Sequence, residues 1–369
     1  MSTAAAIAPM GRLEAFRHLM APDHLRSGFT VAKPAFLRNS LLAGFQAGAT
    51  SAIALPLILM SPAAHMVGYA ALGGMVALFG RFDTPVGRAK VVALAGLTQV
   101  LMVLLMSLAS LYEEPLFQLG ALSLAFGVAY FITISGRFGP PGALIFAFAG
   151  GASLAPVTDV AVAFERTAAT AAVALLAFVI CVATDRLRLR PSAERPLPME
   201  QLRPLRYRLI ASARILIGCG LALFVSHAWG ANHPVWAGMG AMVVLQGPFL
   251  NINMHRALQR MAGAIVGSIL AWVILTQEPS ALTVVALIFV LQMLTELVIG
   301  ANYWLGQIFV TPMALIMSYL AAPGLSGADL ASERVLDSLL GVVIGIVAAV
   351  MLSSMDDRHH LAELRAGGR

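Results

Sequence analysis

Arg214 lies inside the apolar stretch 209–225, where an ionised side chain is costly. A charge in a hydrophobic span costs roughly 2.5–3.5 kcal/mol on insertion scales, so such residues are candidates for function. A guanidinium group offers a planar fork of donors that matches a carboxylate. We therefore expect Arg214 to bind an organic anion, with Gln46 as its counterpart 168 residues earlier. The alternative is that Arg214 only extends its charge to a membrane surface.

Glu296 and Gln292 lie four residues apart in another apolar stretch and so share one helical face. A partly buried glutamate can titrate near neutral pH, which proton-coupled transport requires. We expect this pair to carry proton coupling. A carboxylate that simply lies at the membrane interface is the alternative.

Three arginines precede apolar stretches on the same predicted side of the membrane. Arg256 and Arg260 are four residues apart, and Arg88 repeats the first of them at a distance of 168 positions. We expect these residues to form an entrance that collects anions by electrostatic focusing. The alternative is that they only fix the orientation of the chain.

Proline and glycine interrupt two apolar stretches at corresponding places. One break is the segment 139–142, which contains Pro141, and the other is Thr311 with Pro312. Backbone groups freed by such breaks must face protein or a wet cavity, and paired breaks indicate a binding site. Pro141, Thr311 and Pro312 are therefore predicted to line the site.

His233 and Trp236 stand at the outer end of a further stretch. We expect them to contact an aromatic substrate, although a tryptophan there also fits a simple interfacial anchor. Adjacent acid and base residues at 165–166 and 333–334 precede two later stretches. We interpret both pairs as structural, with gating as the alternative.

Motifs for enzymatic chemistry are missing from the sequence. It contains no phosphate-binding glycine loop, no metal-ligand cluster and no nucleophile paired with a base. Cys181 and Cys219 are isolated in apolar runs. The sequence thus predicts neither catalytic residues, a metal nor a cofactor.

The composition places these residues in a membrane. Of 369 residues, 59% are hydrophobic and 11% are charged, against about 45–50% and 25% in soluble domains. The apolar runs exceed the roughly ten residues of a barrel strand. We therefore predict an all-α integral membrane protein.

About twelve stretches approach the length of a bilayer span. They lie at 41–59, 66–79, 91–111, 116–134, 142–154, 167–182, 209–225, 235–249, 261–276, 282–299, 305–320 and 335–352. Arginine and lysine concentrate in alternate loops, which predicts that those loops and both termini are cytoplasmic in a cell inner membrane. We attribute the net charge of +6 to topology and lipid headgroups rather than to nucleic acid.

The chain matches itself at a shift of 168 positions. His65 aligns with His233, Arg88 with Arg256, and 165–166 with 333–334. Six spans in each copy make the two repeats parallel. We predict an N-terminal cytoplasmic segment (1–38), a first repeat (39–185), a cytoplasmic linker (186–206), a second repeat (207–354) and a cytoplasmic tail (355–369).

Several motifs of the second half form a recognisable series. They are His-Pro-Val-Trp-Ala at 233–237, Val-Val-Leu-Gln-Gly-Pro at 243–248, Arg-Ala-Leu-Gln-Arg at 256–260, Phe-Val-Thr-Pro-Met-Ala-Leu at 309–315 and Glu-Arg-Val-Leu-Asp at 333–337. This series resembles the fusaric acid resistance and aromatic acid exporter family, whose plant relatives include the aluminium-activated malate transporters. The resemblance implies an inner-membrane exporter of aromatic or other weak organic acids, which in many relatives works beside a periplasmic adaptor protein.

The expected function is export of small organic anions, chiefly aromatic carboxylic acids, coupled to the proton gradient. A passive organic-anion channel and a non-transporting scaffold for envelope assembly are the alternatives, and a membrane enzyme has little support. Expected partners are the anion and membrane lipid. An adaptor protein and a homodimer remain open.

Overall fold

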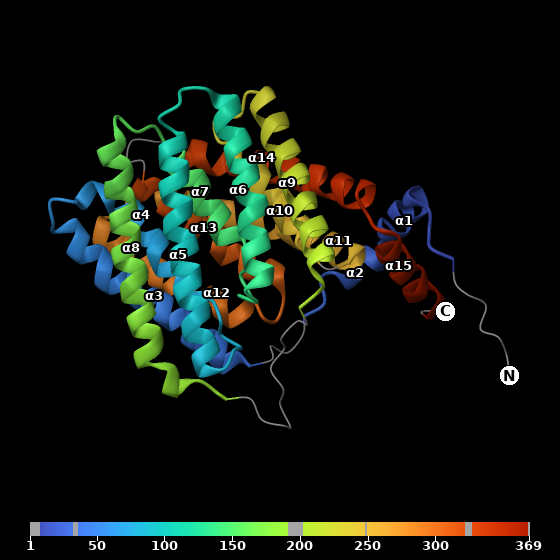
Figure 1. Cartoon of the computed structure of the whole chain (residues 1–369), viewed down its shortest axis with the longest axis horizontal. Helices are drawn as coiled ribbons and strands as arrows, with labels where there is room; N and C mark the ends of the chain where they lie inside the picture. Colours follow the sequence, from blue (N-terminus) through green and yellow to red (C-terminus); the bar gives the residue numbers. More distant parts are fainter. Residues whose placement is uncertain (1–7, 32–35, 191–201, 248, 322–326, 368–369) are drawn as a thin grey trace.

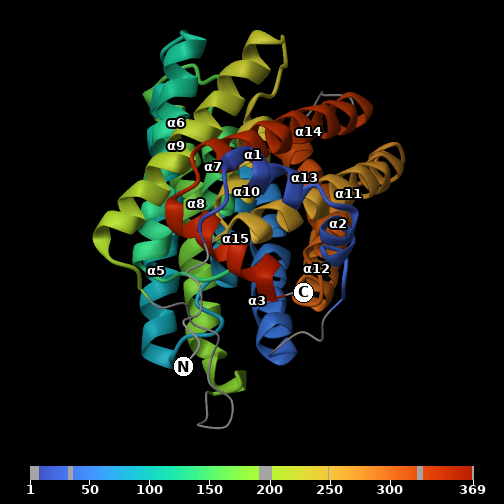
Figure 2. The same ribbon diagram turned by 90° about the vertical axis from the view of Figure 1, so that its right-hand side faces the viewer.

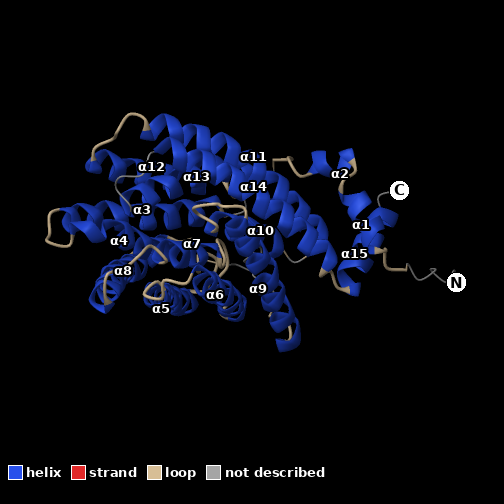
Figure 3. Ribbon diagram, turned by 90° about the horizontal axis from the view of Figure 1, so that it is seen from above, coloured by secondary structure: helices blue, strands red, loops and turns tan. Residues whose placement is uncertain are grey.

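The computed structural model describes residues 8–31, 36–190, 202–247, 249–321 and 327–367. All regular structure in these ranges is helical (Figure 1, Figure 3). In chain order the elements are α1 (Arg12–Leu19), α2 (Pro22–Ser27), α3 (Leu37–Leu59), η1 (Ala64–Met66), α4 (Val67–Gly74), η2 (Met75–Leu78), α5 (Pro85–Ala109), α6 (Pro115–Ser135), α7 (Leu144–Ser153), α8 (Val160–Ala183), η3 (Asp185–Leu187), α9 (Leu205–Ala228), α10 (Val235–Leu245), α11 (Leu250–Leu275), α12 (Ala281–Val298), α13 (Tyr303–Ala321), α14 (Gly327–Met351) and α15 (Met355–Gly367).

Nine of the described helices are long and apolar enough to cross a membrane. They are α3, α5, α6, α8, α9, α11, α12, α13 and α14, and each coincides with one expected stretch. Large apolar side chains cover their outer surfaces; Leu101 and Leu105 of α5, for example, are 44% and 56% exposed. Lipid requires such a surface, so the chain is an all-α, multi-pass membrane protein as its composition predicted.

The remaining three expected spans are short helices. The stretches at 66–79, 142–154 and 235–249 form the segment 64–78, α7 and α10. Helix α10 has 11 residues, which reach about 17 Å at about 1.5 Å per residue, against a hydrocarbon core of about 30 Å. Nearly all residues of α4, α7 and α10 are buried among the long helices. A helix buried in protein has the same apolar composition as one in lipid, and for this reason the sequence did not separate the two cases.

Glycine allows close approach between several helices. A Cβ at Gly267 of α11 would lie 2.8 Å from the Cβ of Thr311 on α13, and a Cβ at Gly44 of α3 would lie 2.8 Å from the Cγ of Glu296 on α12. A side chain at either glycine would displace the neighbouring helix or its side chain. The glycines therefore set the spacing of α11 with α13 and of α3 with α12.

The helices form two sets that are inclined to each other. In Figure 3, α5, α6 and α8 are seen nearly end-on while α11 and α14 lie across the view. Helix α3 packs against α12, and α6 packs against α9.

The two ends of the chain pack together beyond the ends of α11 and α14 (Figure 1, Figure 2). Arg365 of α15 pairs with Glu14 of α1 at 2.7 Å, and Arg358 donates to the carbonyl of Met10 at 3.1 Å. These contacts place α1 and α15 at one end of the molecule.

Candidate anion-binding site

Arg260 projects from α11 into the protein and is 1% exposed. Its Nη1 donates to Oε1 of Gln307 on α13 at 2.8 Å. Its Nε and Nη2 are buried without a hydrogen-bond partner. Arg260 forms no ion pair with the described residues, so its charge is held only by a neutral amide.

Arg334 of α14 lies in the same region and is also 1% exposed. Its Cζ stands 3.9 Å from the ring centroid of Trp236 on α10, a cation–π contact. Its Nε and Nη1 have no hydrogen-bond partner. Arg260 and Tyr303 both interact electrostatically with Arg334. Two guanidinium groups therefore share the space among α10, α11, α13 and α14.

Further polar atoms in these four helices are buried and lack a partner in the described chain. They are Nε1 of Trp236, Oγ of Ser268, the hydroxyl of Tyr303, Oγ1 of Thr311 and Oγ of Ser338. Buried polar groups without a partner are rare and costly in native proteins. Two of these groups belong to residues that interact with Arg334, namely Trp236 and Tyr303, and such donors suit a ligand that carries negative charge and oxygen atoms.

Trp236 gives the site an aromatic wall. It is 5% exposed and stacks on Phe148 of α7, with 5.9 Å between ring centroids and an interplanar angle of 26°. Its other described contact is Arg334. A ring next to a guanidinium group is an arrangement that can hold both parts of an aromatic carboxylate.

His233 lies two residues before the start of α10, the helix that carries Trp236. Its Nδ1 is 2.5 Å from Oε2 of Glu333, the residue before Arg334 in α14. The pair is partly exposed. His233 therefore lies beside the arginine cluster rather than inside it.

Arg214 is separate from this cluster. Its Nη1 pairs with Oδ2 of Asp357 in α15 at 3.2 Å, while its Nε has no partner. The pair joins α9 to the C-terminal helix. A role for Arg214 in anion binding stays a prediction.

Gln46 contacts Arg88 rather than Arg214. The Oε1 of Gln46 accepts a hydrogen bond from Nη2 of Arg88, and its Nε2 donates to Oγ1 of Thr184 at 2.5 Å. Arg88 is 2% exposed and also donates to the carbonyl of Ala77 at 3.3 Å. Of the three arginines expected at an entrance, Arg88 and Arg260 are buried and only Arg256 is partly exposed.

Glu296 is neutralised by an arginine that the sequence did not suggest. Both carboxylate oxygens accept from Arg81, which follows η2, and the Oε1 contact measures 3.3 Å. Both residues are buried. Proton coupling through Glu296 stays a prediction, and it would have to break this pair.

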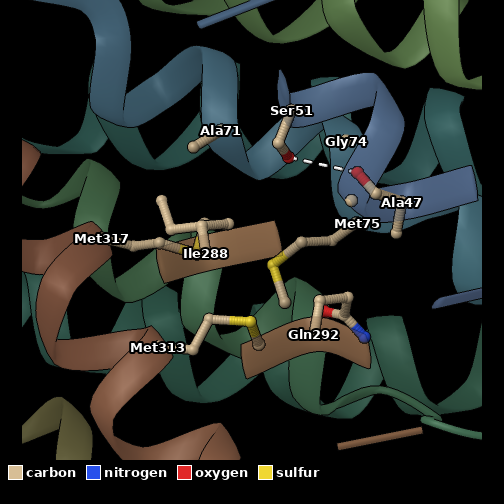
Figure 4. Close-up of a pocket in the computed structure, with 10 residues that line it drawn as sticks. Ala47, Ser51, Ala71, Gly74, Met75, Ile288, Gln292, Met313 and Met317 are labelled. Atoms are coloured by element: carbon tan, nitrogen blue, oxygen red, sulfur yellow. Dashed lines mark hydrogen bonds between the residues drawn. The ribbon is translucent and has the colours of Figure 1, made fainter. Parts of the chain in front are cut away.

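Gln292 lies one turn from Glu296 and lines a small cavity with three methionines, Met75, Met313 and Met317 (Figure 4). The Nε2 of Gln292 has no hydrogen-bond partner. The space available to the centre of a water molecule is about 10 Å³, which is enough for about one water. An aromatic acid does not fit this cavity in the present conformation.

The two predicted breaks differ in form. Thr311 and Pro312 are buried inside the continuous helix α13, one turn beyond Gln307. Pro141 is half-buried in the loop between α6 and α7. No described contact joins Pro141 to the arginine cluster.

Sequence reasoning overlooked Arg334 and Gln307 as site residues. The sequence analysis interprets Glu333 and Arg334 together as a structural pair and does not single out Gln307. The available signal was their position in or next to an apolar stretch, where a polar or charged side chain is costly unless it has a partner.

Comparison with known proteins bears on the same part of the chain. The uncharacterized membrane protein YvaC of Bacillus subtilis (strain 168) is 32% identical over 149 residues, which make up 39% of this chain. The match covers 24% of the length of that protein, so the chain spans only about a quarter of this relative. No solved structure matches the chain. Residues 221–348, which contain the whole arginine cluster, match the family described as fusaric acid resistance protein-like, and this match confirms the resemblance indicated by the motifs of the second half.

Proposed function

We propose that this chain is a membrane transporter for small organic anions and that Arg260 and Arg334 bind the carboxylate of the substrate. The observation that carries this proposal is the burial of two neighbouring guanidinium groups that form no ion pair with the described residues. A buried charge without a partner is strongly destabilising. A bound anion supplies the missing counter-charge.

Arg88, like Arg260, donates only to neutral groups, but two other buried arginines have ion-pair partners. Arg81 is paired with Glu296, and Arg188 is paired with Asp185 at 2.7 Å. These arginines have structural partners within the chain. Arg260 has an amide as its only described hydrogen-bond partner, so its charge is available to a ligand.

Aromatic carboxylic acids are the proposed substrate class. Support comes from Trp236, whose ring lies against Arg334, and from the unpartnered hydroxyl groups of Thr311 and Ser338. A ligand with a carboxylate, a flat ring and a further oxygen would use all three kinds of group.

We further propose two parallel six-helix repeats with the pathway between them. The contact of α3 with α12 has a counterpart in that of α9 with α6, and the contact of α4 with α8 has one in that of α10 with α14. These pairs correspond under the shift of 168 positions. The pairs His65–Glu165 at 3.4 Å and His233–Glu333 at 2.5 Å correspond in the same way.

An inner-membrane location, cytoplasmic termini and outward transport complete the proposal. The clustering of arginine and lysine in alternate loops favours this orientation. The packing of α1 against α15 at one end is consistent with termini on one side.

The test is transport of labelled benzoate by purified protein in liposomes. We expect the wild type to accumulate benzoate and Arg260→Gln to lower the initial rate at least about tenfold, since one charged contact contributes about 1.5–3 kcal/mol. Arg256→Gln is the matched control, because Arg256 lies one turn earlier on α11 and is partly exposed. Equal rates in the wild type and Arg260→Gln would reject the site.

Unlabelled benzoate inside the liposomes distinguishes mechanisms. A carrier that alternates between two faces is accelerated by internal substrate. A passive channel is not accelerated, and its current follows the membrane potential. A scaffold gives no uptake with any variant.

A further inference from the structure

Asp337 lies on α14 one turn after Arg334 and is 5% exposed. Its Oδ1 accepts a hydrogen bond from Oγ of Ser226 on α9 at 2.8 Å. Its Oδ2 is buried with no hydrogen-bond partner, and Asp337 forms no ion pair with the described residues. This carboxyl group is therefore placed in the protein interior with one of its two oxygens unpartnered.

The charged and titratable groups around Asp337 come from several helices. Glu333 lies one turn earlier on α14 and His233 precedes α10, and both act electrostatically on Asp337. Arg334 follows Glu333 on the same helix, and Arg260 of α11 and Tyr303 of α13 interact with Arg334. Helix α10 contributes no titratable residue, and α9 contributes Ser226 with His227 next to it in sequence. A second carboxylate and one histidine thus act on Asp337 directly, and Arg334 lies one turn earlier on the same helix.

We propose that Asp337 is the proton-binding residue of this transporter and that it binds its proton together with the organic anion. The inference rests on the proposed function of the arginine cluster. An anion bound to Arg334 adds negative charge one turn from Asp337, because residues three apart on a helix are neighbours. The bound anion disfavours the charged form of Asp337. Anion binding therefore favours protonation of Asp337, and protonation of Asp337 favours anion binding.

Thermodynamic linkage makes the effect reciprocal. Lower pH strengthens anion binding, and anion binding draws a proton from solution. The proton adds to one oxygen of Asp337 and forms a neutral carboxylic acid, and no other bond changes.

Glu333 and His233 link Asp337 to the protein surface. Glu333 is about a quarter exposed and pairs with His233, which is about a third exposed. Asp337 is one turn deeper on the same face of α14. This order provides a route by which a proton reaches Asp337 from the end of α14 that carries His233.

The experiment measures binding of benzenesulfonate, an aromatic anion that stays ionised from pH 5 to 8, to the purified full chain. For the wild type we expect Kd to fall by up to about tenfold for each unit of pH lowered across the titration of Asp337. For Asp337→Asn we expect a Kd that does not change with pH and equals the low-pH value, because asparagine imitates the neutral acid and keeps an acceptor for Ser226. Glu113→Gln, which neutralises an exposed carboxylate in the loop between α5 and α6, is the control and is expected to keep the pH dependence.

Proton uptake by the wild type provides a second measurement that needs no variant. In weakly buffered solution, adding benzenesulfonate should remove up to one proton per site from the medium. Saturable binding that Arg260→Gln weakens, but without proton uptake at any pH from 5 to 8, overturns this inference and leaves the proposed function standing. Binding that Arg260→Gln does not weaken overturns the proposed function.

Discussion

Replacing Arg260 with methionine tests whether this residue contributes to ligand binding or to the stability of the fold. An ion pair at about 4 Å with an effective dielectric constant of about 20 contributes about 4 kcal/mol, and a hydrogen bond to a charged group contributes about 1.5–3 kcal/mol. The substitution should therefore cost about 2–4 kcal/mol of binding. Since about 1.4 kcal/mol is a factor of ten, the Kd for benzoate should rise about 30- to 700-fold.

The same substitution should have two opposing effects on stability. Arg260 is buried with two nitrogens unpartnered, so its removal relieves an uncompensated charge next to Arg334. It also leaves Oε1 of Gln307 without its donor, at a cost of about 1–3 kcal/mol. Adding Gln307→Leu removes both partners of that hydrogen bond. We expect the double variant to melt at or above the temperature of the wild type, with about 2–4 °C gained per kcal/mol.

A thermal-unfolding assay with and without benzoate reads both effects at once. A ligand that binds only the folded state raises Tm, so benzoate should raise the Tm of the wild type and of the control Arg256→Met. It should leave the Tm of Arg260→Met unchanged. A large drop in the Tm of the double variant, with benzoate stabilisation retained, would show that Arg260 is structural and would refute the reasoning.

Three other predictions test the surroundings of the site. Glu296→Gln leaves Arg81 buried without its counter-charge, so it should lower the free energy of unfolding, measured by chemical denaturation, by about 3–5 kcal/mol. The double variant Arg81→Met with Glu296→Leu should restore most of that loss. Gly267→Ala should cost about 1–3 kcal/mol because its Cβ would lie 2.8 Å from an atom of α13, whereas Gly120→Ala, with no atom within 4 Å, should cost nothing. Burial and two neighbouring histidines lower the pKa of His24 from 6.5 to about 4, so protonation of His24 opposes docking of α2. Docking should be complete above about pH 6.5 and should be lost as the pH falls toward 4. Hydrogen exchange at residues 22–31 measures this loss, and His24→Gln should remove the pH dependence.

The positions of the long helices could be predicted because length and apolar composition are local properties. Helices α5 and α12, for example, cover the stretches expected at 91–111 and 282–299. The short helices could not be separated from spans in this way. Their burial depends on which helices surround them, and that information is not contained in a window of the sequence.

The candidate site was only partly predictable for the same reason. Trp236, Arg260 and Thr311 were singled out from their types, but nothing in their spacing placed Arg334 over the ring of Trp236. The pairing of Glu296 with Arg81 joins residues 215 positions apart, and that of Arg214 with Asp357 joins residues 143 positions apart. Such contacts depend on how helices cross. Because a buried charge is costly, the sequence indicates that the charged residue has a partner. It does not indicate which residue or ligand that partner is.

Two arginines that align under the proposed repeat have different surroundings. Arg166 and Arg334 correspond under the shift of 168 positions, and each lies over an aromatic ring, at 4.7 Å from Tyr69 and 3.9 Å from Trp236. Arg166 also donates to the carbonyls of Ser153, Ala155 and Pro156 at 2.8–3.3 Å.

Those carbonyls lie at and just beyond the C-terminus of α7, where helix carbonyls need donors, so Arg166 has a structural role. Arg334 retains two unpartnered nitrogens and has a second cation, Arg260, nearby. The position equivalent to Arg260 in the first half is Val92. At these two aligned positions the second half thus has two charges, whereas the first half has one, which the backbone satisfies. This asymmetry is expected if substrate binding was concentrated in the second half while the first half kept the arginine for packing.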